Sequence, residues 1–288
     1  MAQSNRLLTC SAPAKLNLFL LVTGRRPDGY HTLQTLFRFV DRADELTFGL
    51  RSDGRVTRVT ELVGIAESDD LTVRAARLLQ AETGCGFGVD ITLRKHLPLG
   101  GGLGGGSSDA ATTLIALNRL WDLRLPRPKL QELGLKLGAD VPVFVFGRNA
   151  FAEGIGERLQ AIDLPPAWYL VLVPPVPVSS AEVFADPQLT RSTTPVTIRA
   201  FSEGCDASGL FGRNDLEAVV CRRYPEVAQH LRWLQRFGPG ALTGSGACVY
   251  CPFDSETRAR SALAQLPAGM QGFVAEGLTR HPLLDWLD

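Results

Sequence analysis

The segment from Pro98 to Ala110, with the sequence PLGGGLGGGSSDA, restricts what this chain can fold into more than any other. Six of the seven residues from 100 to 106 are glycine, and glycine lets the backbone adopt positive φ and expose its N–H groups. A helix is predicted directly afterwards, from Ser107 to Leu120, and its N-terminus adds free N–H groups and partial positive charge. A flexible linker is the alternative, but the predicted strand, the glycine loop and the predicted helix follow one another with no spare residues between them. The pattern favours a phosphate-binding loop, with the candidate residues Pro98, Leu99, Gly100, Gly101, Gly102, Leu103, Gly104, Gly105, Gly106, Ser107 and Ser108.

Two common nucleotide-binding loops do not fit this segment. A Walker A loop ends in Gly-Lys-Ser/Thr, whereas these glycines lead into Ser107, Ser108 and Asp109 without a lysine. The dinucleotide pattern GxGxxG fits residues 102–106 poorly, and no opening strand with a matching acidic residue supports it. The two serine hydroxyls can bind phosphate oxygens or a magnesium ion.

Three further clusters have both a functional and a purely structural interpretation. Lys15 and Asn17 lie two positions apart in an apolar strand and therefore share one face. A lysine there is either an edge residue that extends to water or a functional cation. For Asp140, within GADVP, the structural interpretation is an aspartate that caps a turn before a strand. For residues 243–247 (TGSGA) it is a plain hairpin turn.

The spacing of apolar residues predicts an α+β chain in two parts. Before residue 160 we expect strands at 7–11, 15–22, 33–40, 45–50, 89–94 and 151–153, and helices at 69–82, 107–120 and 128–137. Ser68 or Asp69 is the expected cap of the first helix. Proline and small residues gather around 161–168, so 1–160 and 161–288 are the expected domains. The second contains predicted strands at 169–173, within 241–250 and at 272–276, and helices at 215–223, 225–237 and 255–266.

Composition excludes several classes of protein. The 288 residues include 30 Lys+Arg and 30 Asp+Glu, a formal net charge of zero, so the basic character of a general nucleic-acid binder is missing. No apolar run reaches the roughly 18 residues that a membrane-spanning helix needs, and residues 1–10 do not resemble a secretory signal. The six scattered cysteines are expected to be reduced thiols of a cytoplasmic protein. Cys248 and Cys251 form a CxxC, but no second half-site for zinc accompanies them.

Taken in order, the clusters resemble the GHMP kinases, the family of galactokinase, homoserine kinase and mevalonate kinase. The resemblance covers most of residues 10–160 and returns at 211–217 and 242–247. It rests on the segments Ala12–Leu18, Gly24–His31, Leu33–Phe37, Pro98–Ser108, Gly138–Phe144 and Gly154–Glu157. The finer likeness is to the branch of the family that transfers a phosphate from ATP to the 2-hydroxyl of CDP-methylerythritol in the non-mevalonate isoprenoid pathway. The resemblance implies a first domain like the second domain of ribosomal protein S5, a ferredoxin-like second domain, and an active site in the cleft between them.

The resemblance also implies roles for the phosphate-transfer residues. Asp140 would be the general base that accepts the proton of the acceptor hydroxyl, and Lys15 would lie beside it and stabilise charge. Asn17 would orient the substrate, and the glycine loop would hold the phosphates of ATP together with Mg²⁺. No carboxylate is assigned as a magnesium ligand.

The cytidine end of the substrate would be read by residues from both domains. Tyr30 and Phe184 would stack on the two faces of the cytosine ring, and His31 would hydrogen-bond its edge through backbone and side chain. The late glycine turn would help to close the site through Gly244, Ser245 and Gly246.

Two features depart from the family pattern, and other functions remain possible. Asp70 stands where related kinases commonly carry Asn, so an adenine contact there is not expected, and the Thr- and Pro-rich connector at 186–195 has no match. The alternatives are another GHMP kinase, a catalytically inactive nucleotide or sugar sensor on the same fold, and an RNA-binding protein. Zero net charge disfavours the last. The expected partners are small molecules, without nucleic acid or membrane, and the expected state is a monomer or weak homodimer.

Overall fold

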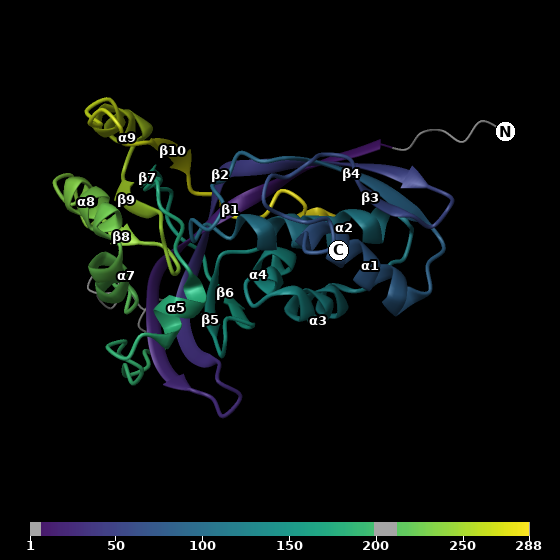
Figure 1. Cartoon of the computed structure of the whole chain (residues 1–288), viewed down its shortest axis with the longest axis horizontal. Coiled ribbons are helices and arrows are strands. Elements are labelled where there is room, and N and C mark those ends of the chain that lie inside the picture. Colours follow the sequence, from purple (N-terminus) through teal and green to yellow (C-terminus); the bar gives the residue numbers. More distant parts are fainter. Residues whose placement is uncertain (1–6, 199–211, 288) are drawn as a thin grey trace.

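The computed structural model describes residues 7–198 and 212–287, which form two sheets, each packed against helices (Figure 1). The first sheet contains β1–β6 and the second contains β7–β10. Cys205 and Phe211, the first residue of the 211–217 match, lie outside the described residues.

Two long antiparallel strands, β1 (Leu7–Arg25) and β2 (His31–Arg51), form the centre of the first sheet. The sequence predicts four shorter strands here, but bulges rather than turns absorb the irregular positions. At Pro13, which has no N–H to donate, the register shifts and the strand continues. The other strands are β3 (Val56–Arg58), β4 (Gly88–Arg94), β5 (Ala150–Glu153) and β6 (Arg158–Ala161).

Four helices gather on one side of this sheet and enclose the larger core (Figure 1). They are α1 (Leu71–Thr83), α2 (Gly105–Leu120), α3 (Arg127–Leu137) and α4 (Val141–Phe146). Helix α2 begins directly after the glycine loop and is buried along almost its whole length. The cap of α1 is Asp70, not Ser68 or Asp69 as predicted. Its carboxylate accepts the Thr72 N–H at 2.7 Å and is paired with buried Arg58 at 2.9 Å.

The second sheet is antiparallel, in the order β10-β7-β9-β8. Its strands are β7 (Trp168–Leu172), β8 (Ala241–Leu242), β9 (Val249–Phe253) and β10 (Gly272–Glu276). Helices α7 (Glu217–Arg223), α8 (Pro225–Leu234) and α9 (Glu256–Leu263) lie on the side away from the first part (Figure 1). A short helix that the sequence does not predict, α5 (Ser180–Ala185), lies instead at the start of β2, where Phe184 stacks on His31.

The two parts are joined along β1 and by the end of the chain. Leu20 N–H donates to the Arg213 carbonyl, and Gly212 N–H to the Leu18 carbonyl, both at 2.9 Å. After β10 the chain returns to the first core, where Leu283 is buried ahead of the 3₁₀ helix η2 (Leu284–Trp286). The division at residue 160 stays a prediction, and residues 278–287 pack with the first part.

Candidate active site

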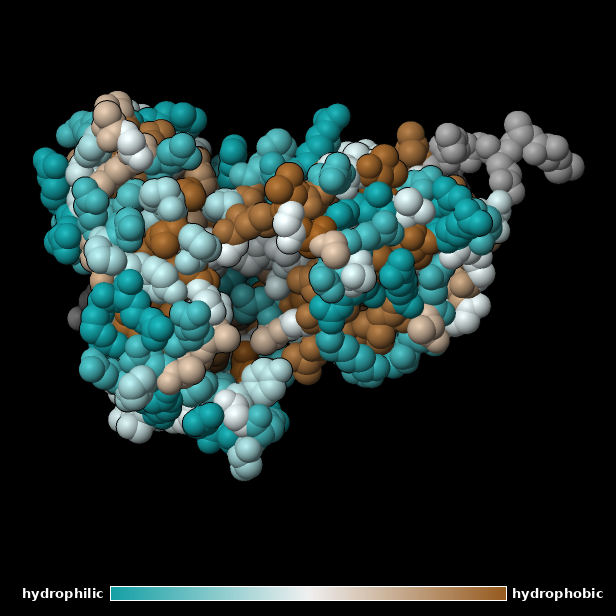
Figure 2. Space-filling view, in the orientation of Figure 1, coloured by the Kyte–Doolittle hydropathy of each residue, from teal (hydrophilic) through white to brown (hydrophobic). Residues whose placement is uncertain are grey.

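A cavity of about 890 Å³ opens between the two parts, where the molecular surface is hollowed (Figure 2). Its walls come from segments far apart in the sequence: the middle of β1, the start of β2, the glycine loop, the segment before α4, helix α5 and the late glycine turn. Apart from helix α5, of which only Phe184 is singled out, these are the segments that the sequence singles out.

The glycine loop adopts a backbone that other residues would resist. Gly100, Gly102 and Gly104 have φ of 67°, 76° and 73°. A Cβ on Gly102 would lie 2.2 Å from the Thr243 carbonyl oxygen, so the loop and the late glycine turn touch through bare backbone. The loop ends in the first turn of α2, which lines the cavity and whose N–H groups have no acceptor within the helix. This arrangement suits an anionic ligand.

Backbone hydrogen bonds hold the loop in place from outside. Ala247 N–H donates to the Gly100 carbonyl at 3.2 Å, and Cys248 N–H donates to the Gly101 carbonyl at 3.0 Å. On the other side, Lys15 N–H donates to the Leu103 carbonyl at 3.0 Å. The loop is therefore fixed to β1 in the first part and to the end of the turn that precedes β9 (Val249–Phe253) in the second.

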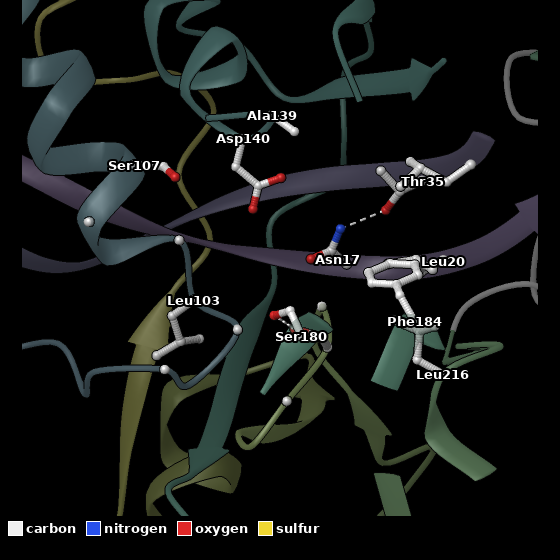
Figure 3. A pocket seen from close by; sticks show the side chains of 18 of the residues that line it. Asn17, Leu20, Thr35, Leu103, Ser107, Ala139, Asp140, Ser180, Phe184 and Leu216 are labelled. Atoms are coloured by element: carbon white, nitrogen blue, oxygen red, sulfur yellow. Dashed lines mark hydrogen bonds between the residues drawn. The ribbon is translucent and has the colours of Figure 1, made fainter. Parts of the chain in front are cut away.

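Lys15 lies at the centre of the cavity wall, with only 2% of its side chain exposed. Its ammonium is 3.3 Å from Asp140 and donates to the amide oxygen of Asn17 at 2.5 Å. The Asn17 amide donates in turn to the Thr35 hydroxyl at 2.8 Å, the dashed line in Figure 3. The Thr35 hydroxyl donates to the Phe19 carbonyl. This chain of bonds fixes the position of the buried cation.

Asp140 is the accessible end of that network. Its side chain is 37% exposed, and although it is the N-cap of α4, it makes no capping hydrogen bond. Figure 3 shows its carboxylate directed into the cavity, opposite Asn17 and near Ser107 of α2. A carboxylate held beside a buried ammonium, and not used for capping, is available to accept a proton.

The far end of the cavity is aromatic. The rings of His31 and Phe184 stack with centroids 5.1 Å apart and an interplanar angle of 26°. Tyr30 is 59% exposed at the rim. Ser180 and Ser245 hydrogen-bond to each other at 2.5 Å, which joins α5 to the late glycine turn. The structure therefore places Phe184 against His31, with Tyr30 at the rim, and the stacking of cytosine between Tyr30 and Phe184 stays a prediction.

A second charged cluster lies behind the loop. The Lys95 ammonium contacts both Asp44 and, at 2.8 Å, Asp109. Burial, only partly offset by Lys95, raises the pKa of Asp109 to about 7. Through Lys95 and Asp109, the cluster connects the segment before the glycine loop to helix α2, which follows the loop.

Comparison with known proteins places these features in a family. Residues 70–148 match the model of the GHMP kinases N terminal domain, and residues 197–272 match that of the GHMP kinases C terminal domain. The 4-diphosphocytidyl-2-C-methyl-D-erythritol kinase of Thiobacillus denitrificans is 61% identical over 96% of this chain and 97% of its own length. The enzyme of the same name from Nitrosospira multiformis is 60% identical over 98% of this chain and 95% of its own. The chain belongs to the GHMP kinase family.

A GHMP kinase is an ATP-dependent small-molecule kinase, and the fold agrees with this assignment. A crystal structure of 4-(cytidine 5'-diphospho)-2C-methyl-D-erythritol kinase superposes with a TM-score of 0.80 at 34% identity, covering 94% of this chain and 99% of that one. Homoserine kinase from Cytophaga hutchinsonii has the same fold, with a TM-score of 0.66 at 16% identity and 98% of each chain covered. The predicted α+β, two-domain GHMP kinase fold is confirmed.

Almost every site residue predicted for this GHMP kinase lines the one cavity. The exception is Ser108, which is fully buried one position beyond the lining residue Ser107. Three side chains that the sequence does not single out also contact the site or the helix behind it: Thr35 bonds to Asn17, Lys95 to Asp109, and Arg191 to His31. Thr35 lies within the matched segment 33–37, but no pattern in the sequence points to Lys95 or Arg191.

Proposed function

We propose that this GHMP kinase transfers the γ-phosphate of ATP to the 2-hydroxyl of 4-diphosphocytidyl-2-C-methyl-D-erythritol, a step of the non-mevalonate isoprenoid pathway. The observation that carries the proposal is the Lys15–Asp140 pair, which lies in one cavity with a glycine loop at one end and an aromatic wall at the other. The names of the relatives that match nearly the full chain support the same acceptor.

In this proposal Asp140 is the general base. A hydroxyl is a weak nucleophile, so a carboxylate that takes its proton as the oxygen attacks phosphorus lowers the barrier. Lys15 stabilises the charge that develops on the reacting groups, and its burial strengthens this interaction. Asn17 holds the ammonium in place and presents its amide to the cavity.

ATP would lie with its phosphates on the glycine loop and the first turn of α2. Mg²⁺ usually keeps several waters and takes only one or two protein ligands beside the phosphates. The hydroxyl of Ser107 at the start of α2 fits this requirement, because Ser107 lines the cavity directly after the glycines. The Ser108 Oγ is buried one position further on and has no hydrogen-bond partner among the described residues. When bound, the ion would neutralise charge on the phosphate oxygens.

The acceptor would lie with its cytosine at the aromatic wall. Phe184, which stacks on His31 in the structure, would offer its other ring face to a pyrimidine, and Tyr30 at the rim would cover the second face of the base. The imidazole of His31, which lines the same cavity, would hydrogen-bond the edge of the base. Gly244, Ser245 and Gly246 line the cavity opposite the glycine loop and would close around the diphosphate. No helix among the described residues is long and apolar enough to cross a membrane. A cytoplasmic location and a monomeric or weakly dimeric state stay predictions.

The test is ADP release by the purified protein when CDP-methylerythritol, mevalonate and homoserine are offered separately with ATP and Mg²⁺. We expect rapid, acceptor-dependent ADP release with CDP-methylerythritol only, and a phosphorus NMR signal from a new phosphate monoester. Equal or faster turnover with mevalonate or homoserine would assign the chain to another branch of the family. Absence of turnover with all three would contradict the proposal.

A further inference from the structure

Arg191, in the connector after α5, makes an unusual set of contacts for an arginine near a substrate cavity. Its Nε donates to His31 Nε2 at 3.0 Å. One terminal nitrogen donates to the carbonyls of Phe184, at 2.9 Å, and Asp186, at 2.8 Å. The other donates to the Leu189 carbonyl at 3.2 Å. Its partners among the described residues are all uncharged, so these contacts of the guanidinium fix geometry rather than form an ion pair.

We propose that Arg191 is a positioning residue of the acceptor site, which holds His31 in the neutral tautomer with its proton on Nδ1 and holds Phe184 against it. The inference rests on the proposed function, since it concerns the cytidine end of that site. A guanidinium has no acceptor and stays charged at any working pH, so in this bond Nε2 must supply the lone pair. The ring proton is therefore on Nδ1.

The surroundings of His31 reinforce this state. Partial burial, and then the positive charges of Arg191 and Arg25, lower the pKa of the imidazole below its usual value. Within residues 7–198 and 212–287, the charged groups that act on the ring are these two cations, which come from the connector and from the end of β1. The neutral ring also stacks on Phe184, whose carbonyl the same guanidinium binds.

The tautomer matters because it decides what the ring offers to a ligand. Among the described residues no group hydrogen-bonds to His31 Nδ1, and His31 lines the cavity. A fixed Nδ1–H donor can be met by the ring nitrogen N3 or the carbonyl oxygen of cytosine, both of which are acceptors. The other tautomer would offer a lone pair, which only the amino group could meet. Arg191 would thus determine which edge of the base the site reads.

Nitrogen NMR of the imidazole rings tests the proposal independently of catalysis. In the wild-type protein at pH 7 we expect the His31 signals, assigned with His31→Gln, to be those of a neutral ring protonated on Nδ1. In Arg191→Met we expect a mixture of tautomers and a His31 pKa that is higher than in the wild-type protein, although burial and Arg25 still act on the ring. A wild-type ring protonated on Nε2, or on both nitrogens at pH 7, overturns the proposal without need of any variant.

Kinetics test whether the tautomer matters for the acceptor. Arg191→Met should raise the KM for CDP-methylerythritol about tenfold, the loss of one well-placed hydrogen bond, and leave the KM for ATP within about twofold. As the pH falls, the KM for CDP-methylerythritol should also rise more strongly in Arg191→Met than in the wild-type protein, because the variant's ring gains a proton more readily. Thr193→Val is the matched control, because it removes the 2.6 Å bond from the connector to Asp215 without touching His31.

The outcomes separate positioning from simple loosening of the connector. If Thr193→Val raises the acceptor KM as much as Arg191→Met does, with the His31 signals unchanged, Arg191 is only a structural brace and the proposal fails. If Arg191→Met leaves the tautomer and the KM unchanged, it fails as well. If the wild-type protein does not turn over CDP-methylerythritol at all, the proposed function fails, whatever the NMR result for the ring.

Discussion

Replacing Gly102 with alanine should separate the glycine loop from the late glycine turn. The added Cβ would lie 2.2 Å from the Thr243 carbonyl oxygen and 3.1 Å from that of Gly246, so backbone must move. Gly100 provides a matched control, because it also has positive φ but its Cβ would meet nothing within 4 Å. The two substitutions therefore share backbone strain and differ in the collision.

The structure gives the size of the difference. Positive φ costs a non-glycine residue about 1–2 kcal/mol in either variant. In Gly102→Ala, the two backbone bonds from Ala247 and Cys248 to the loop would also lengthen or break, at about 1 kcal/mol each. Because 1 kcal/mol lowers Tm by about 2–4 °C in a chain of this size range, Gly102→Ala should melt about 4–8 °C below Gly100→Ala.

Thermal unfolding of both variants without nucleotide measures this difference free of any effect of a bound phosphate. Calorimetry with ATP should then show the weaker binding in Gly102→Ala. Equal melting temperatures for the two variants would mean that the loop does not depend on the late turn, and would refute the reasoning.

Three further substitutions give distinct expectations. Phe184→Ala should raise the KM for CDP-methylerythritol about ten- to a hundredfold, with the KM for ATP near wild type, because stacking on a base contributes roughly 1–3 kcal/mol; an unchanged KM in a folded variant would make Phe184 a core residue. Burial lowers the pKa of His281 to about 3. As the pH falls below about 6.5, only the unfolded state binds the His281 proton, so the free energy of unfolding should fall by up to about 1.4 kcal/mol per pH unit. Denaturant titrations at pH 7 and 5 should show a smaller fall in His281→Asn, and an identical fall would contradict the assignment. Asp109 has a folded-state pKa raised to about 7, so between pH 3.8 and 7 the folded state binds the proton more tightly than the unfolded state, and stability falls as the pH rises through this range. Asp109→Asn should therefore melt above wild type at pH 8, and by a smaller margin at pH 5. A margin that does not change with pH would argue against the raised pKa.

Local patterns predicted most of the longer elements but not their exact limits, and they did not predict the short elements β3, α4, β6 and α5. Helix α2 is evident from its apolar spacing, whereas the cap of α1 depends on a distant residue, since buried Arg58 holds Asp70 in place. β1 continues through Pro13 because a bulge there is compatible with pairing to β2. Helix α5 has only six residues after a proline-rich stretch, and its position depends on contacts across the cavity such as Ser180 with Ser245.

The site residues likewise divide into those that the sequence makes conspicuous and those that only the fold reveals. Glycine loops, and a lysine inside an apolar strand, are conspicuous in the sequence because they contradict the needs of a core. The pairing of Lys15 with Asp140 came from the resemblance, and its distance of 3.3 Å from the structure. Arg191 could not be recognised from the sequence, because its role depends on a fold that brings the connector back to His31 at the start of β2.

The rate of phosphate transfer in Asp140→Asn, measured in a single turnover with saturating ATP and CDP-methylerythritol, tests the central claim most directly. Asparagine preserves shape and leaves Asn17 as an acceptor for the Lys15 ammonium, but it cannot take a proton. We expect the rate to fall by about 10²–10⁴ while the Kd for ATP stays within about threefold of wild type. A rate near that of the wild type in a folded variant would show that Asp140 is not the base.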